Sequence, residues 1–275
     1  MKLGSTESHP LVEVGRGGVL ALDSRCTLTE ILRDGGDPTA YKAVGTGLAP
    51  LRAPLRPGKI VAIGLNYRDH IRETGMEAPA EPLIFAKFPS SVIGPGEAIR
   101  IDRELTKRVD WEVELAVVVG PRMHRVSESD ALPHVFGYTI GNDVSARDLQ
   151  FSDGQWVRGK SLDTFCPLGP VVVTVDEIAD PQALRLETRV NGETMQSSST
   201  SEMIFGVAEL LAYCSRCFVL EPGDVVLTGT PWGCGEFMDP PRCLEPGDRV
   251  DVEIEGIGTL HNPVKGLDEE VSGSG

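Results

Sequence analysis

Three carboxylates could form one site in this chain of 275 residues: Glu112, Glu114 and Asp143. Side chains alternate between the two faces of a β-strand, so Glu112 and Glu114 point the same way. Like charges at the edge of a core are costly unless an opposite charge neutralises them. Three oxygen donors suit Mg²⁺ or Mn²⁺, disfavour zinc and copper, and leave positions open for substrate. The alternative is an exposed strand end with solvated carboxylates.

A possible catalytic base lies elsewhere in the chain. His70 and Glu73 are three residues apart on a predicted short helix, so they share one helix face. A carboxylate that orients and polarises an imidazole is the arrangement of a catalytic dyad. The alternative for His70 is an ordinary surface histidine, and for Lys160 and Arg147 it is solvated surface charge. The spacing alone does not choose between these interpretations.

Two predicted strands would carry the carboxylates. The run 115–119 is apolar, mostly β-branched and ended by Gly120, which predicts a buried strand with both glutamates at its mouth. Asp143 follows a second predicted strand, residues 135–140. Short strands and few long helices favour a mainly β domain over a doubly wound α/β sheet.

Local signals predict the other connections and one domain boundary. Glycine and proline are frequent in residues 45–58, so we predict a small N-terminal α+β domain over 1–57 and a catalytic domain over 58–270. Turn and capping patterns predict a hairpin in 11–23, a helix capped by Thr27 and Glu30, a polar loop over 155–163, a hairpin turning at Asn191-Gly192, a helix capped by Ser199 and Glu202, and turns at 221–224 and 245–248.

Composition limits the partners. The net charge of −15 makes nucleic acid and anionic membranes poor partners, whereas a small anionic substrate could still bind local Arg and Lys residues. No run reaches the ~20 apolar residues of a membrane span, and the N-terminus lacks an apolar signal segment, so we expect a cytoplasmic protein. The six cysteines are scattered, with one C-x-x-C at Cys214 and Cys217, which favours reduced thiols. Residues 272–275 resemble a linker and are excluded.

The chain resembles the fumarylacetoacetate hydrolase family from about Lys59 to Val264. Seven motifs in order carry the resemblance: 64–70, 85–91, 110–115, 142–148, 155–161, 163–165 and 228–231. The resemblance implies a mixed β-sandwich, or β-roll, around a metal, and a homodimer. It also implies Mg²⁺ or Mn²⁺ as the cofactor, with Ca²⁺ as a substitute in crystals.

The resemblance also assigns roles to single residues. It implies metal ligands at Glu112, Glu114 and Asp143, a water-activating dyad at His70 and Glu73, a substrate-contacting lysine at Lys160, and further substrate contacts at Arg147, Gln150 and Thr230. A fourth, more N-terminal metal carboxylate of some members has no clear counterpart here.

The activity implied is C–C bond hydrolysis in a β-diketo acid of the acylpyruvate or fumarylpyruvate type, in aromatic catabolism. Water activated by the dyad would attack the distal carbonyl, and the metal and Lys160 would stabilise a pyruvate-type enolate. Oxaloacetate decarboxylation and keto–enol isomerisation pass through the same enolate, so both remain alternatives. A non-catalytic binding protein is a third alternative, against which the intact triad and dyad argue.

The segment that carries the dyad is predicted to be a lid. Residues 66–75 are mostly polar and form at most about two and a half helical turns. Isolated helices this short are marginal in water. We therefore predict that the segment is mobile without ligand and closes when an α-keto acid binds, with Gly64 and Gly75 as hinges.

Overall fold

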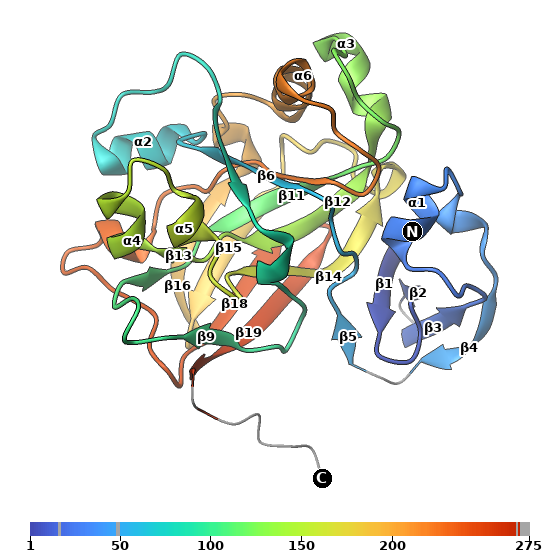
Figure 1. Cartoon of the computed structure of the whole chain (residues 1–275), viewed down its shortest axis with the longest axis horizontal. Coiled ribbons are helices and arrows are strands. Elements are labelled where there is room, and N and C mark those ends of the chain that lie inside the picture. Colours follow the sequence, from blue (N-terminus) through green and yellow to red (C-terminus); the bar gives the residue numbers. More distant parts are fainter. Residues whose placement is uncertain (16–17, 48–49, 268, 270–275) are drawn as a thin grey trace.

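The computed structural model describes residues 1–15, 18–47, 50–267 and 269. Within them, three β-sheets and a few short helices form one layered body with the N-terminal strands at one end (Figure 1). This is the mainly β, mixed-sandwich class that the sequence predicts.

The largest sheet has twelve strands, ten of them in the order β4-β3-β2-β1-β14-β12-β11-β17-β6-β7, with β5 on β1 and β8 on β14. Most neighbours pair antiparallel, but β17 pairs parallel with β6, so the sheet is mixed. The strands are β1 Lys2–Thr6, β2 Val12–Gly15, β3 Gly18–Leu22, β4 Ala43–Gly47, β5 Leu51–Arg52, β6 Ile60–Gly64, β7 Leu83–Lys87, β8 Val92–Ile93, β11 Val113–Val119, β12 Val135–Asn142, β14 Cys166–Thr174 and β17 Val225–Leu227.

A second sheet packs on one face of the first. It has five strands in the order β16-β15-β18-β19-β9. These are β9 Ile99–Ile101, β15 Arg185–Val190, β16 Glu193–Ser199, β18 Arg249–Ile254 and β19 Gly258–Gly266. A third, two-stranded sheet joins β10 Val109–Asp110 to β13 Ser145–Ala146 beside the carboxylates.

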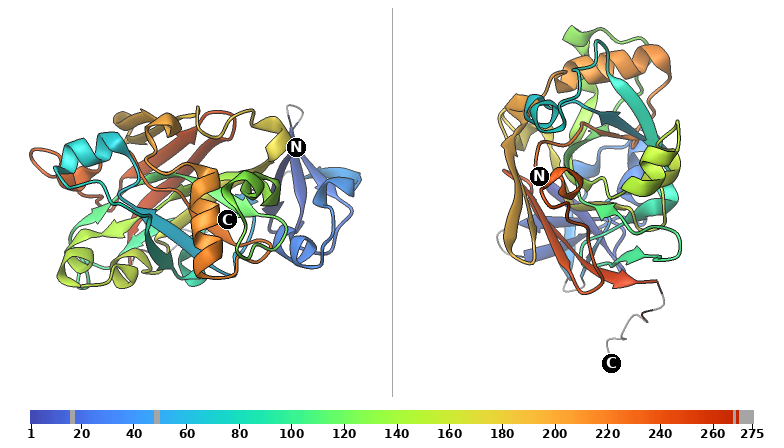
Figure 2. Two further views of the ribbon diagram at one scale, coloured as in Figure 1. Left: turned by 90° about the horizontal axis from the view of Figure 1, so that it is seen from above. Right: turned by 90° about the vertical axis from the view of Figure 1, so that its left-hand side faces the viewer.

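The α-helices are short and lie outside the sheets. They are α1 Leu28–Arg33, α2 Arg68–Thr74, α3 Glu128–Ala131, α4 Arg147–Ser152, α5 Val157–Lys160 and α6 Val207–Cys217. The 3-10 helices are Pro38–Ala40, Pro89–Ser91, Leu132–His134, Val175–Glu177, Thr200–Glu202 and Gly235–Phe237. Helices α2, α4 and α5 share the end of the molecule farthest from the N-terminal strands (Figures 1 and 2). No helix in the described ranges is long and apolar enough to cross a membrane.

Strand β11 lies between two hydrophobic clusters, and all seven of its residues are buried. Its odd-numbered side chains join the cluster that includes the five-stranded sheet, whereas Ala116 and Val118 join a cluster on the opposite face. Glu114 lies two residues before Ala116, so its side chain points to the same face of the strand as Ala116 and Val118. The buried-strand prediction for 115–119 is confirmed, and the strand begins two residues earlier.

The N-terminal strands extend the main sheet. Strand β1 pairs antiparallel with β14, with Leu3 opposite Val172. The hairpin in 11–23 and the capping box of Thr27 and Glu30 are confirmed. Residues 45–58, whose glycines and prolines led us to place a domain boundary there, include the end of β4 and all of β5, because both segments pair with N-terminal strands. The domain boundary near residue 57 stays a prediction.

Two other local predictions are wrong. Residues 155–163 contain α5 instead of only a loop. Ser199 caps the 3-10 helix Thr200–Glu202, and the extended ψ of 138° at Met203 separates this turn from α6. The turns are confirmed, since Asn191, Gly192, Gly223 and Gly247 all have positive φ. The linker-like residues 272–275 lie outside the described residues.

Candidate active site

The three predicted metal carboxylates converge. One oxygen from each of Glu112, Glu114 and Asp143 lies within 4.8 Å of the other two, and all three residues are buried. Antiparallel pairing of β11 with β12 brings them together, because Val113 is opposite Asn142. The backbone N–H of Asp143 donates to the carbonyl of Glu112 at 2.9 Å. The exposed-strand-end alternative is therefore wrong.

Two buried lysines face these carboxylates. Lys160 Nζ lies 2.7 Å from Glu112 Oε2 and 2.9 Å from Asp143 Oδ2. Lys87 Nζ lies 2.5 Å from Asp143 Oδ1 and also donates to the carbonyls of Val144 and Lys160. Burial lowers the pKa of Lys160, but the charges of Asp143 and Glu112 outweigh it, so this pKa is raised. The ammonium is therefore charged where it meets the carboxylates.

Arg147 closes the other side of Glu112. Its Nη1 lies 2.6 Å from Glu112 Oε1, and its Nη2 lies 2.7 Å from Asp110 Oδ2. Burial raises the pKa of Glu112, but Lys160 and then Arg147 lower it more, so the net pKa is below its ordinary value. Gln150 Oε1 accepts a hydrogen bond from Arg147 at 3.0 Å. The guanidinium is thus held by protein acceptors.

Glu114 differs from the other two carboxylates. Its Oε2 accepts the backbone N–H of Gly229 at 2.7 Å, and no described Lys or Arg forms an ion pair with it. Burial, followed by Asp143 and Glu112, raises the pKa of Glu114 well above its ordinary value. A buried acid that forms no ion pair with a described lysine or arginine, in an all-oxygen cluster, fits a hard divalent cation.

The dyad is assembled. His70 Nδ1 lies 3.0 Å from Glu73 Oε2, and both side chains are largely buried. Glu73 Oε1 accepts the backbone N–H of Gly233 at 2.8 Å, which fixes the carboxylate. The carboxylate can only accept, so Nδ1 donates and Nε2 is left as the basic nitrogen. The Phe237 ring packs edge-on against His70, with ring centroids 5.4 Å apart. The surface-histidine alternative is wrong.

Helix α2 is fastened at its N-terminal end. The buried side chain of Asn66 donates to the carbonyls of Phe205 and Thr228 at 3.1 and 2.7 Å and accepts from the N–H of Phe205 at 2.9 Å. Tyr67 is also fully buried. Although residues 66–75 are mostly polar, Asn66 and Tyr67 at the start of the segment are buried through long-range contacts. Its closure on ligand binding stays a prediction.

The predicted hinge at Gly64 has another explanation. A Cβ at this position would lie 2.6 Å from the ring of Trp156, the residue before α5, so close packing against this ring accounts for the glycine. Gly75, the other predicted hinge, ends α2 in the left-handed conformation, with φ 66°.

A narrow cavity of about 40 Å³ is lined both by His70 of the dyad and by the carboxylates Glu112 and Glu114. Its lining includes His70, Glu112, Glu114, Arg147, Gln150, Lys160 and Thr230, together with the apolar side chains of Ile63, Leu65, Met76, Phe85, Phe151, Trp156 and Phe237. Thr230 Oγ1 accepts a hydrogen bond from Gln196 Nε2 at 2.9 Å. Seven of the nine predicted site residues thus line one space.

Comparison with known proteins places this site in a family. A family model described as fumarylacetoacetate hydrolase, C-terminal, matches residues 59–265. The chain belongs to the fumarylacetoacetate hydrolase family. It is 48% identical over 229 residues to oxaloacetate tautomerase FAHD2A, mitochondrial, of Bos taurus, covering 82% of this chain and 72% of the relative. It is 50% identical over 218 residues to oxaloacetate tautomerase YisK of Bacillus subtilis, covering 78% and 72%.

A solved structure of the family extends the likeness to nearly the whole chain. Fumarylacetoacetate hydrolase of Exiguobacterium antarcticum has 41% sequence identity and a TM-score of 0.85, covering 97% of this chain and 99% of that one. The names of these relatives therefore include both tautomerase and hydrolase.

Several residues of this family site were not predicted. Asp110 lies two residues before Glu112, so the two-residue period of a strand could have placed it on the same face as Glu112 and Glu114. Lys87 is a single charge at the end of an apolar strand, which was a weaker signal. Phe237 and Cys234 approach the dyad only through the loop after Thr230, and nothing in their spacing predicts this.

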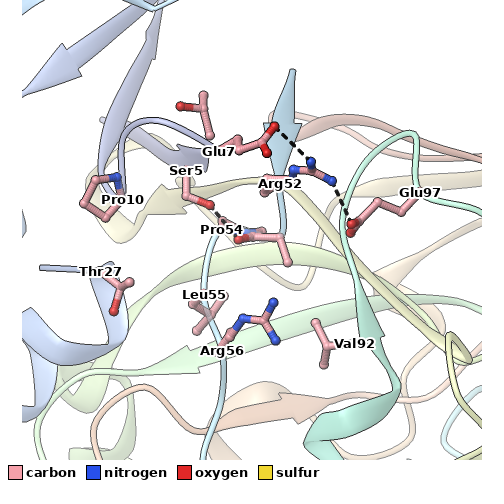
Figure 3. Close-up of a pocket in the computed structure, with 12 residues that line it drawn as sticks. Ser5, Glu7, Pro10, Thr27, Arg52, Pro54, Leu55, Arg56, Val92 and Glu97 are labelled. Atoms are coloured by element: carbon pink, nitrogen blue, oxygen red, sulfur yellow. Dashed lines mark hydrogen bonds and ion pairs between the residues drawn. The ribbon is translucent and has the colours of Figure 1, made fainter. Parts of the chain in front are cut away.

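A larger cavity of about 450 Å³ lies beside the N-terminal strands (Figure 3). Arg52 crosses its rim between Glu7 and Glu97, at 3.4 and 2.9 Å. None of the predicted site residues lines it, so we assign the chemistry to the narrow cavity.

Proposed function

We propose that this chain catalyses keto–enol tautomerisation of oxaloacetate, or of a closely similar 2-oxo dicarboxylate, with a divalent cation held by Glu112, Glu114 and Asp143. The observation that carries the proposal is the His70–Glu73 dyad, whose His70 lines the same narrow cavity as Glu112 and Glu114. Two relatives about half identical to this chain are named oxaloacetate tautomerases. This corrects the order of our expectations, since the isomerase alternative has better support than acylpyruvate hydrolysis.

The reaction moves one proton and needs no water. His70 Nε2 takes a proton from C3, the C–H electron pair forms the C2=C3 bond, and negative charge develops on the C2 oxygen. Glu73 stabilises the imidazolium through Nδ1. Return of the proton to that oxygen gives the enol. Mg²⁺ or Mn²⁺ at the triad would supply positive charge for the enolate oxygen and the adjacent carboxylate.

Lys160 and Arg147 have different parts in this proposal. Lys160 Nζ lies between Glu112 and Asp143, where it can also interact with charge developing on the substrate. Arg147 is occupied by Asp110, Glu112 and Gln150. We therefore propose that Arg147 and Gln150 position Glu112 and shape the cavity, in place of the direct substrate contact first expected. Thr230 lines the cavity and keeps its proposed contact with the substrate.

The test measures tautomerisation directly. Decay of the ultraviolet absorption of enol-oxaloacetate should accelerate on adding protein with Mg²⁺ or Mn²⁺, beyond the buffer-catalysed rate. His70→Ala should lower kcat by ~10²-fold or more, the scale of a lost general base. No acceleration by the metal-loaded wild-type protein would refute the proposal.

Decarboxylation and hydrolysis are the competing reactions on the same groups. Both release pyruvate, from oxaloacetate or from an acylpyruvate, whereas tautomerisation does not. The name of the Exiguobacterium protein favours testing hydrolysis. A coupled pyruvate assay on both substrates, beside the enol assay, ranks the three activities.

Assembly and location are part of the proposal. We propose a homodimer in the cytoplasm, acting on a small anionic keto acid; the bovine relative is mitochondrial by name, so cell fractionation is the relevant test of location. Light scattering should give twice the chain mass of 29.6 kDa. A role in aromatic catabolism has no support in these relatives' names.

A further inference from the structure

A second group of metal-binding side chains lies beside the carboxylate triad. One ligand atom from each of His70, Glu73 and Cys234 lies within 4.8 Å of the other two. Cys234 is fully buried, and among the described residues its sulfur has only long polar contacts, 3.8 Å from Gln196 Nε2 and 3.9 Å from the carbonyl of Pro231. No strong hydrogen bond from this part of the chain therefore competes for the sulfur.

The donor set differs in kind from the triad. It offers nitrogen, oxygen and sulfur, the ligands typical of Zn²⁺, whereas the triad offers only oxygen. A tetrahedral zinc ion with bonds of about 2.0–2.3 Å would hold its ligand atoms about 3.3–3.8 Å apart. His70 Nδ1 and Glu73 Oε2 already lie 3.0 Å apart, so the adjustment falls on Cys234, whose sulfur would have to approach them by at most on the order of 1 Å. Three protein ligands would leave a fourth position for water.

We propose that His70, Glu73 and Cys234 form a second, borderline-soft metal site that binds Zn²⁺, and that zinc bound there inhibits the enzyme. On binding, the thiol S–H bond breaks, its proton leaves to solvent, and a zinc–sulfur bond forms. Zinc also bonds to His70 Nδ1 and to the carboxylate of Glu73, and the proton that Nδ1 donated to Glu73 passes through solvent to Nε2. The protonated Nε2 can then no longer take a proton from substrate. Binding is independent of the proposed function, and only the inhibitory effect rests on it.

Charge and access both suit this occupant. The ion's two positive charges balance the Glu73 carboxylate and the Cys234 thiolate, so the occupied cluster is neutral and the burial of charge is compensated. His70 lines the narrow cavity, and the side chain of Glu73 is 15% exposed, so an ion can reach the donors through the substrate's route. Activating Mg²⁺ and inhibitory Zn²⁺ would then occupy neighbouring sites selected by donor type.

The alternative is that Cys234 only fills space. A small buried thiol packs like a hydrophobic side chain, and its proximity to the dyad would then have no chemical consequence. The two interpretations differ in whether this sulfur bonds to a metal, which can be observed directly.

The experiment uses Co²⁺ as a spectroscopic probe for the zinc position. Co²⁺ is added to the full-length protein with Mg²⁺ in excess to occupy the carboxylate triad, and the thiolate-to-cobalt charge-transfer absorption is recorded. Zinc inhibition of tautomerisation is measured in parallel, each variant being compared with its own zinc-free rate. Cys234→Ser and Cys234→Ala remove the sulfur in two ways, in case one fails to fold. Cys217→Ser, which changes an exposed thiol on α6, is the matched control.

We expect the absorption band in the wild type and in Cys217→Ser, its loss in both Cys234 variants, and its displacement by Zn²⁺. The zinc concentration for half-inhibition should rise roughly 10- to 100-fold without Cys234. Removing a residue that only hydrogen-bonds to a metal ligand already lowers metal affinity by about this factor. Absence of the band in the wild type, or its persistence without Cys234, would overturn the site. A band without any tautomerase activity would refute the proposed function and leave the metal site standing.

Discussion

Lys87 Nζ lies 2.5 Å from Asp143 Oδ1, and neither side chain has any exposed surface. The same ammonium donates to the carbonyl of Lys160, the residue whose own ammonium contacts the other oxygen of Asp143. One buried lysine thus fixes a predicted metal ligand and the backbone of the residue expected to contact substrate. The edge strand β7 is thereby joined to the site.

Removing Lys87 should destabilise the metal-free protein. Lys87→Met leaves the buried Asp143 with one cation fewer, and breaking a buried pair in this way typically costs about 3–5 kcal/mol of unfolding free energy. Chemical denaturation in EDTA measures the effect. Adding Asp143→Asn to Lys87→Met should recover part of the loss; a double variant less stable than either single one would contradict the coupling.

Glu114 should be more important for the metal than for the fold. Burial and its acidic neighbours raise the pKa of Glu114, so Glu114→Gln should keep or increase metal-free thermal stability while weakening Mg²⁺ binding strongly. Thermal melts with EDTA and with Mg²⁺ show both effects, and exposed Glu128→Gln is the control. EDTA should abolish wild-type activity and Mg²⁺ or Mn²⁺ should restore it. Full activity without metal would refute the site.

Asn66 should control the position of α2. Asn66→Ala removes three hydrogen bonds and leaves buried backbone groups unpaired, each costing about 1–3 kcal/mol. Hydrogen exchange in 66–75 should rise above wild type, and kcat should fall as His70 loses its position. Oxalate should slow exchange in this segment of the wild type. Unchanged exchange with oxalate would mean that the segment is not a lid. Thr74→Ala, a substitution in the same segment that leaves the hydrogen bonds of Asn66 in place, is the control.

Thiol reactivity should separate the six cysteines. Burial raises the pKa of Cys166 and of Cys214 to about 12, so these thiols stay neutral at pH 8. The exposed Cys26 and Cys217 should react first with an aromatic disulfide reagent, and denaturation should reveal all six. The pKa values of these two buried thiols are higher in the folded than in the unfolded protein. Their contribution to the free energy of unfolding should therefore be lost as pH rises from about 9 toward 12. A Cys214–Cys217 disulfide would contradict the prediction of reduced thiols.

The sequence allowed the site to be predicted where the chemistry depends on local periodicity. Glu112 and Glu114 are paired by the two-residue period of a strand, and His70 and Glu73 by the helical spacing. The buried strand followed from the apolar run, and the turns from glycine positions that require positive φ. In each case, the relevant contact lies within a few residues along the chain.

The remaining features depend on contacts between distant segments. Asn66 bonds to Phe205 and Thr228, and its residue type indicates neither burial nor partner. The role of Arg147 depends on Asp110, 37 residues earlier. Residues 45–58 contain parts of β4 and β5, because pairing with β3 and β1 outweighs the local turn preference of glycine and proline. The motifs also left the reaction open, since several reactions share one enolate.

The alternation along β11 makes this enzyme tolerant of some genetic changes and intolerant of others. Replacing Glu114 alters chemistry on one side of the strand and leaves the packed residues of the other side in place. Inserting or deleting a single codon between Glu114 and Val119 would exchange the two sides beyond it, because each residue would then face the other way. Each apolar group would move from its own cluster into the differently packed cluster on the other face, and pairing with β12 and β17 would slip. In a random library, clones in which one residue of this strand is inserted or deleted should therefore yield no folded protein. Clones with a substitution at Glu114 should yield folded but inactive protein.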